Sequence, residues 1–389
     1  MTSARVTADN WGFPPFNRAS FQQVQALFPT ARIRRGNNPA TGFGKAAREL
    51  GDISYTGLDG NRRTVKEMLD DGYTDSFLVT REGAIVSEQH FNGMATDSHH
   101  LMNSMTKSFV GALTGIVVED GSLDLDRPVA AYAPELEKTA FSATTTRHLL
   151  DMTAAVQYGE DYADPNADFW IEAAVVGWRP ALVNSDSAKS LFDYVSSLQE
   201  KEQLDGEKFH YRTVLTNVLG MVLERATGRG LDELIQTEIW SKLGADEDAS
   251  IVVDPTGFPY VGAGMSACPR DLARFGQMIA QRGHFNGQQI VPAAWIDDIR
   301  HADAHTRKVF EESGYGATMP GAHYRNQFWV TNPDRGVLLA IGIHGQTIHI
   351  DMSNGVVIVK LSSQPESLHL LMYLDTWAAM TAISEALSC

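Results

Sequence analysis

Branched and aromatic residues gather in short runs near both ends of the chain. Residues 77–91 hold two such runs on either side of Glu82-Gly83, which predicts a β-hairpin. Near the C-terminus, further runs separated by turn residues predict an antiparallel meander over 328–331, 337–344, 347–351 and 355–363. We therefore expect one sheet that is built from both ends of the chain.

Between these runs, apolar residues mostly recur at helical spacing. Met105, Phe109, Leu113 and Ile116 predict a helix that ends at Gly121. The same reasoning predicts helices over 61–72, 146–151, 188–198, 214–227, 231–243, 269–282, 292–300 and 368–387.

The order of these elements indicates an α/β (α+β) protein, with an antiparallel sheet flanked by helices. Residues 1–60 are rich in Gly, Pro, Asn and Arg, and we expect them to form an ordered arm. We assign 1–123 and 261–389 to an α/β domain and 124–260 to a mainly α-helical insert. An active site would lie in the cleft between them, a favoured position for a ligand site.

The composition excludes several classes of partner. The chain has 32 basic and 48 acidic side chains and a net charge of −16, which argues against binding to nucleic acid or to an anionic membrane. We found no apolar secretion signal and no run of membrane-spanning length, so we expect a cytoplasmic protein. The two cysteines, Cys268 and Cys389, are expected to be free thiols. The oligomeric state is left open, a homodimer included.

The most informative local motif is Ser104-Met105-Thr106-Lys107 at the start of a predicted helix. Positions three apart are neighbours on a helix, so the amine of Lys107 can reach the hydroxyl of Ser104. A serine needs a base to become a nucleophile, and a lysine can be that base only when it is neutral, a state that burial favours. The alternative for this motif alone is a helix cap followed by a solvated lysine.

The sequence after this motif resembles class C β-lactamases, family VIII esterases and related penicillin-recognising proteins. The resemblance lies in the Gly-x-Leu-x-Leu-Asp-x-Pro-Val run at 121–129 and in Thr-Arg-His-Leu-Leu-Asp-Met-Thr at 146–153. It implies a β-lactamase/transpeptidase-like fold with Ser104 as nucleophile and Lys107 as base. Met152 stands where that superfamily usually has His.

Two more superfamily motifs have partial counterparts. Tyr211 matches the tyrosine of a Tyr-x-Asn motif and would relay a proton to the leaving group, although Thr213 replaces the Asn. Its alternative is a packed tyrosine at the start of a helix. The segment 341–346 (Ile-Gly-Ile-His-Gly-Gln) takes the place of a Lys-Thr-Gly or His-x-Gly strand. The backbone N–H groups of Ser104 and Ile343 would form the oxyanion hole, and His344 and Gly345 would line the cleft.

Segments at 161–165, 177–179, 270–274, 341–346 and 357–363 narrow the resemblance to the 6-aminohexanoate-dimer hydrolases, which cleave nylon-oligomer amides and short esters. It extends from about residue 10 to the C-terminus. It implies that Tyr162 contacts the substrate amide, with an ordinary loop aromatic as the alternative. An acidic residue that assists amide substrates corresponds to Ala173, next to Glu172, and an Asn associated with high amidase activity corresponds to Gly262. Both replacements disfavour dimer cleavage more than ester cleavage.

Trp178, in the helical part, is a candidate for lining a substrate pocket, with core packing as the alternative. We expect no metal and no cofactor, because the histidine clusters lack metal-ligand spacing and no phosphate-binding loop is present.

The sequence therefore predicts a serine hydrolase that acts on a small-molecule ester or linear amide. One alternative is a β-lactamase or D-amino-acid peptidase of the same fold, which the missing Lys-Thr-Gly and Tyr-x-Asn motifs disfavour. The other is a non-catalytic ligand-binding module.

Overall fold

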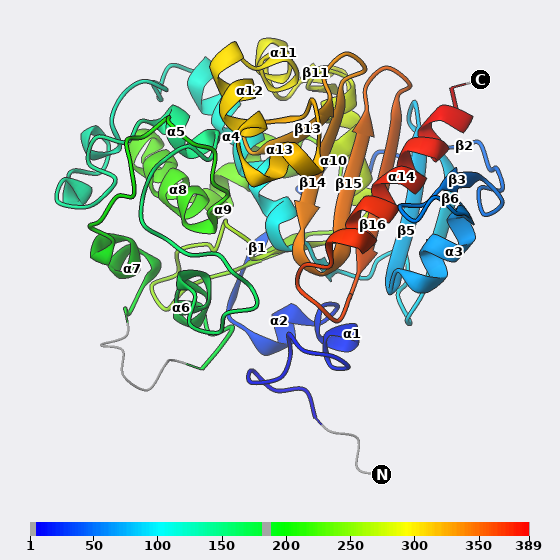
Figure 1. Ribbon diagram of the computed structural model, residues 1–389, viewed down its shortest axis with the longest axis horizontal. Helices are drawn as coiled ribbons and strands as arrows, with labels where there is room; N and C mark the ends of the chain where they lie inside the picture. Colours follow the sequence, from blue (N-terminus) through cyan, green and yellow to red (C-terminus); the bar gives the residue numbers. More distant parts are fainter. Residues whose placement is uncertain (1–4, 181–187, 389) are drawn as a thin grey trace.

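A computed structural model describes residues 5–180 and 188–388. Its centre is an eight-stranded sheet in the order β12-β13-β14-β15-β16-β5-β6-β2, built from both ends of the chain as expected (Figure 1). Neighbouring strands are antiparallel except for β2 and β6. The strands are β2 (Gly44–Lys45), β5 (Thr74–Arg81), β6 (Ala84–His90), β12 (His323–Arg325), β13 (Phe328–Asn332), β14 (Val337–Gly342), β15 (Gln346–Asp351) and β16 (Val356–Ser362).

The two faces of this sheet contact different sets of helices. Along β5, Phe77 and Val79 belong to a core cluster shared with α3 (Val65–Asp71) and α14 (Leu370–Ala386), whereas Leu78 belongs to the larger cluster on the opposite face. This is the alternation that a strand buried on both faces requires. Helix α10 (Pro269–Ala280) packs against β5, β15 and β16. The sheet is therefore a layer between helices.

A second sheet, which the sequence patterns did not predict, lies beside the first. It has the order β1-β8-β9-β7 and contains β1 (Thr30–Ile33), β7 (His100–Leu101), β8 (Ala249–Val252) and β9 (Met265–Ala267). Strand β8 falls inside 124–260, the range assigned to the helical insert, but it pairs with β1 and β9, which lie outside that range. The predicted arm at 1–60 thus contributes strands to both sheets.

The helical half occupies the other side of the molecule (Figure 1). It contains α5 (Thr146–Leu150), α6 (Asp168–Val175), α7 (Leu191–Ser197), α8 (Thr213–Thr227) and α9 (Leu231–Leu234), with the short turns η2 (Val129–Ala131) and η3 (Pro134–Leu136). Helix α4 (Thr106–Glu119), which falls within 1–123, packs against α8 and also against β13 and β14. The remaining elements are α1 (Asn17–Ser20), α2 (Val24–Leu27), β3 (Ser54–Thr56), β4 (Arg62–Thr64), β10 (His284–Phe285), β11 (Gln288–Gln289), α11 (Ala293–His301), α12 (Ala304–Glu311) and α13 (Gly314–Thr318).

Three of the predicted elements were wrong in part. The helix expected over 61–72 begins only at Val65, because Thr64 caps it with Glu67 in a capping box and the residues before it pair as β4. The helix expected over 231–243 changes to a π-helical stretch, η4, at Ile235–Trp240. The strand expected over 337–344 ends at Gly342, and Ile343–Gly345 form a 3₁₀ turn, η5.

Cys268 is a buried free thiol, as predicted, and Cys389 lies outside the described residues. Within 5–180 and 188–388, no helix is long and apolar enough to cross a membrane.

Candidate active site

Ser104 and Lys107 lie at the junction between the 3₁₀ turn η1 (Asn103–Met105) and α4. The helical geometry places Lys107 Nζ 2.9 Å from Ser104 Oγ, as the spacing predicted. Lys107 is buried, whereas Ser104 keeps 8% of its surface exposed. Burial lowers the pKa of Lys107 to about 8, against the opposing influence of Glu160 and Glu172. A substantial fraction of this amine is therefore neutral near pH 8.

The other contacts of Lys107 set the direction of its lone pair. Its Nζ lies 2.6 Å from the carbonyl oxygen of Gly262 and 3.0 Å from Thr213 Oγ1. The Thr213 hydroxyl donates its own proton to Glu160 Oε1 at 2.7 Å, so its oxygen accepts from Lys107. A neutral amine has two N–H donors, and both are used by Gly262 and Thr213. The lone pair is then left to face Ser104 Oγ.

Two acidic side chains, Glu160 and Glu172, hydrogen-bond to the groups that surround Lys107. Glu160 accepts hydrogen bonds from the backbone N–H and hydroxyl of Thr213 and, at 2.6 Å, from the hydroxyl of Tyr162. Glu172 accepts from Tyr158 and from Asn217, whose side-chain oxygen in turn holds the N–H of Gly262 at 2.9 Å. Burial raises the pKa of both acids, that of Glu172 to about 8.

The sequence patterns do not indicate the roles of Glu160 and Thr213, because the contacts of these residues join segments 53 residues apart in the chain. Ala173, at which the resemblance predicts the loss of an acidic side chain, is completely buried in α6. Gly262 also has no room for a side chain, since a Cβ there would lie 2.6 Å from Thr213 Cγ2.

Tyr211 lies immediately before α8 and beside the serine and lysine. Its ring stacks on Trp329, and Lys107 Nζ lies 5.0 Å from the ring centroid. Burial and the charge of Glu160 raise the pKa of its phenol well above the usual value, while a hydrogen bond with Ser104 opposes that change. The phenol is therefore protonated at neutral pH and in contact with the serine hydroxyl.

The turn η5 carries Ile343, His344 and Gly345 towards the serine. Asn103, next to Ser104, donates from Nδ2 to the carbonyl oxygen of Ile343 at 3.0 Å. His344 has a left-handed φ of 63°, and burial lowers its pKa to about 4, so the ring is neutral. Its Nδ1 lies 2.7 Å from the carbonyl oxygen of Gln364. The N–H of Gly345 donates to the Tyr373 hydroxyl, so it is not directed at the serine.

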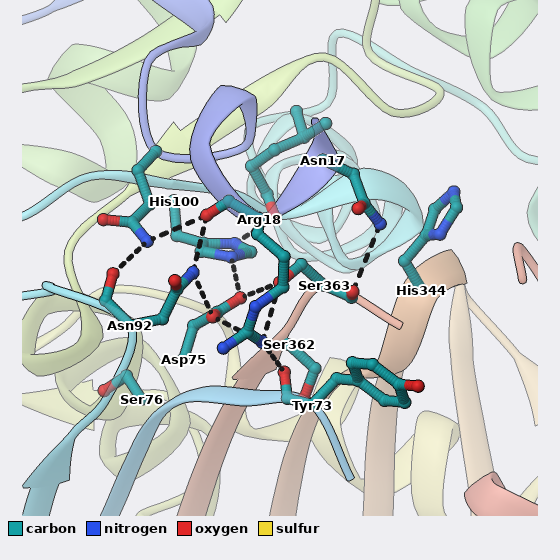
Figure 2. A network of polar contacts seen from close by, with 12 residues as sticks. Asn17, Arg18, Tyr73, Asp75, Ser76, Asn92, His100, His344, Ser362 and Ser363 are labelled. Atoms are coloured by element: carbon teal, nitrogen blue, oxygen red, sulfur yellow. Dashed lines mark hydrogen bonds and ion pairs between the residues drawn. The ribbon is translucent and has the colours of Figure 1, made fainter. Parts of the chain in front are cut away.

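A polar network joins the N-terminal arm to two segments, the one that leads to η1, which contains Ser104, and the one that packs against η5. Asp75, which is fully buried, accepts from Ser363 Oγ at 2.6 Å and lies 3.1 Å from His100 Nε2 and 3.0 Å from Arg18. Figure 2 shows Asp75 between these groups, with Asn17 donating to the backbone beside His344. The network links His100, four residues before Ser104, to the segment that holds η5.

Two pockets share Tyr162 and Ser367 in their walls, and each includes a neighbour of the serine and lysine, Asn103 in the first and Tyr211 in the second. We call the first the aromatic pocket; it measures about 120 Å³ and is lined by Trp11, Gly12, Phe13, Phe21, Asn103, Tyr162, Phe169, Trp170, Trp178, Arg179, Ile343, His344, Pro365 and Ser367. We call the second the acidic pocket; it measures about 550 Å³ and is lined by Glu160, Asp161, Tyr162, Ala163, His210, Tyr211, Tyr315, Glu366, Ser367 and Leu368.

Of the residues predicted from sequence, Ile343, His344 and Trp178 line the aromatic pocket, Tyr211 lines the acidic pocket and Tyr162 lines both. No cluster of His, Cys, Asp and Glu that could hold a metal ion occurs in the part of the chain that the structure describes.

The fold and this arrangement define the class of protein. Residues 61–379 match the Beta-lactamase family model, so the chain belongs to that family, and it has the fold of its serine hydrolases.

The more similar relatives have narrower names. The chain is 34% identical to the 6-aminohexanoate-dimer hydrolase of Paenarthrobacter ureafaciens over 92% of its own length and 88% of the relative. A solved Bacillus anthracis structure named as a 6-aminohexanoate-dimer hydrolase superposes with a TM-score of 0.90 at 30% identity, covering 98% of this chain and 97% of that one. A family VIII carboxylesterase shares the fold alone, with a TM-score of 0.58 and 17% identity over 82% of this chain and 95% of that one.

Proposed function

We propose that the protein hydrolyses carboxylic esters and linear amides through an acyl-enzyme on Ser104, in the cleft between the α/β part (1–123 and 261–389) and the helical part (124–260). The observation that carries this proposal is the set of contacts around Lys107. Gly262 and Thr213 occupy both N–H donors of a neutral amine, so the remaining lone pair points at Ser104 Oγ.

The chemistry follows from this geometry. Lys107 accepts the Ser104 proton as Oγ bonds to the substrate carbonyl carbon, whose π electrons move to its oxygen. The backbone N–H groups of Ser104 and Ile343 stabilise that oxyanion. When the intermediate collapses, the bond to the leaving group breaks, and Tyr211 supplies that group's proton while taking one from Lys107. Water then attacks the acyl-enzyme by the same steps in reverse and releases the acid.

Ester cleavage should be faster than amide cleavage. An amine leaves less readily than an alkoxide, so it depends more on prompt proton delivery. The relatives named for the 6-aminohexanoate dimer make that dimer the amide to test. A Cβ at Gly262 would press on Thr213 and displace the carbonyl group that binds Lys107.

The test compares hydrolysis of p-nitrophenyl butyrate and of the 6-aminohexanoate linear dimer by the wild type and by Ser104→Ala. We expect ester turnover by the wild type, slower dimer turnover, and a loss of roughly 10⁴-fold or more in the variant, because removal of a nucleophile leaves only binding and oxyanion stabilisation. Circular dichroism controls for folding. Wild-type rates in Ser104→Ala, or a folded wild type that cleaves neither substrate, would contradict the proposal.

A further inference from the structure

The aromatic pocket and the acidic pocket differ in charge. The positions of Tyr211 and of the residues near the proposed oxyanion hole indicate which pocket holds the acyl group and which holds the leaving group. Tyr211 delivers a proton to the leaving group and lines the acidic pocket, so the leaving group must depart on that side. Asn103 and Ile343, which flank the proposed oxyanion hole, line the aromatic pocket. The acyl group therefore extends into the aromatic pocket. This assignment rests on the acyl-enzyme function proposed above.

The aromatic pocket contains one cationic side chain, Arg179, in a wall that is otherwise mainly aromatic. The Arg179 Cζ lies 3.5 Å from the centroid of the Trp170 ring and 5.1 Å from that of Phe13. Stacking on aromatic faces holds the guanidinium plane while leaving its N–H groups free at the edges. Those edges form the planar donor fork that matches a carboxylate.

Arg179 lacks an acidic partner within the described residues. No ion pair or hydrogen bond joins its guanidinium to a described carboxylate, and burial alone lowers its pKa. Glu160, Asp161 and Glu366 line the acidic pocket and not the aromatic pocket. A half-buried cation in a chain of net charge −16 is thus kept apart from the acids of the site.

We propose that the aromatic pocket binds the acyl arm of the substrate and that Arg179 pairs with a carboxylate at the far end of that arm. The substrate class is then the half-esters and half-amides of short dicarboxylic acids. The small volume, about 120 Å³, suits a short acyl arm. The acidic pocket, which is several times larger, accepts an uncharged or cationic leaving group and disfavours an anionic one. The 6-aminohexanoate linear dimer has an ammonium at the end of its acyl arm and a carboxylate on its leaving group, so this assignment makes it a poor substrate, in line with the slower turnover expected above.

The test is the ratio of kcat/KM for mono-p-nitrophenyl adipate to that for p-nitrophenyl hexanoate. The two acyl chains have the same length and differ by one carboxylate, and enzyme-free blanks remove spontaneous hydrolysis. We expect the wild type to favour the half-ester. Arg179→Gln should lower the ratio by about 10- to 100-fold, the range for loss of a charge-assisted pair. Arg179→Lys should give an intermediate ratio, because an ammonium lacks the planar fork.

Arg62→Gln makes the same change of charge on exposed β4 and should keep the wild-type ratio. An unchanged ratio in Arg179→Gln, or equal losses with both esters, would overturn the assignment of Arg179. If hexanoate hydrolysis proceeds normally and needs Ser104, that failure concerns the acyl pocket alone. If neither ester is cleaved in a Ser104-dependent way, the proposed function has failed, and the acyl pocket fails with it.

Discussion

Within residues 5–180 and 188–388, two buried serine–lysine pairs occur, and only one of them has the surroundings of a catalytic site. Ser104–Lys107 lies at the start of α4, and Lys360–Ser362 lies on one face of β16. In both pairs the amine is bonded to the serine hydroxyl and to a backbone carbonyl group, that of Gly262 or Gly72. Burial lowers the pKa of both lysines, to about 8 for Lys107 and about 7 for Lys360.

The difference lies in access and in the neighbouring groups. Ser362 and Lys360 are 0% exposed inside the central sheet, so no substrate can reach them. Ser104 keeps 8% exposure, and its neighbours Tyr211 and Asn103 line the acidic pocket and the aromatic pocket respectively. A neutral lysine beside a serine is therefore not enough for hydrolysis. The site also needs an entrance, an oxyanion hole and a proton donor for the leaving group.

The largest effect should come from removing one lysine or the other. Lys107→Met should lower ester kcat/KM by about 10²- to 10⁴-fold, the usual contribution of a general base. Lys360→Met should stay within about threefold of the wild type, because its amine touches no reacting group. Steady-state kinetics with p-nitrophenyl butyrate measure both, after thermal melts confirm folding. Similar losses in the two variants would show that access does not distinguish the pairs.

A smaller loss of activity is expected from replacing Thr213, which accepts a hydrogen bond from Lys107. Among the described residues, no such hydroxyl binds Lys360 besides that of Ser362. Wild-type kcat/KM should rise with pH through about 8, because only the neutral form of Lys107 accepts a proton and its pKa is lowered to about that value. Thr213→Val should keep that direction but reduce the high-pH plateau by about 10- to 100-fold, since the lone pair is no longer oriented. Thr213→Ser should restore the plateau. A wild-type plateau in the valine variant would rule out the orienting role.

The local features of the fold and of the site could be predicted from the sequence. The spacing of Ser104 and Lys107 is a property of one helical turn, and the hairpin at β5–β6 follows from one turn signal between two apolar runs. The small sheet could not be predicted, because β1, β7, β8 and β9 are two to four residues long and come from distant segments. The turn at Ile343–Gly345 continues an apolar run, and only long-range contacts such as that of Gly345 with Tyr373 show where the strand stops.

The same limit applies to the site. Glu160 lies in a segment whose sequence is typical of an acidic loop. Its role in orienting Thr213 depends on the fold, which brings the Thr213 hydroxyl into contact with its carboxyl group. Thr213 was visible as a departure from the usual Asn, but its role follows only from the direction of its hydroxyl bond. The lowered pKa of Lys360 could not be predicted either, because the apolar sequence of β16 does not show how deeply the lysine is buried.

Covalent labelling is a direct test of whether Ser104 is the nucleophile. The protein is treated with a fluorophosphonate probe, and the modified residue is located by mass spectrometry of the intact chain and its peptides. We predict a single adduct on Ser104 in the wild type, none in Ser104→Ala, and an unchanged adduct in Ser362→Ala. An adduct that persists in Ser104→Ala, or one that maps to Ser362, would contradict it.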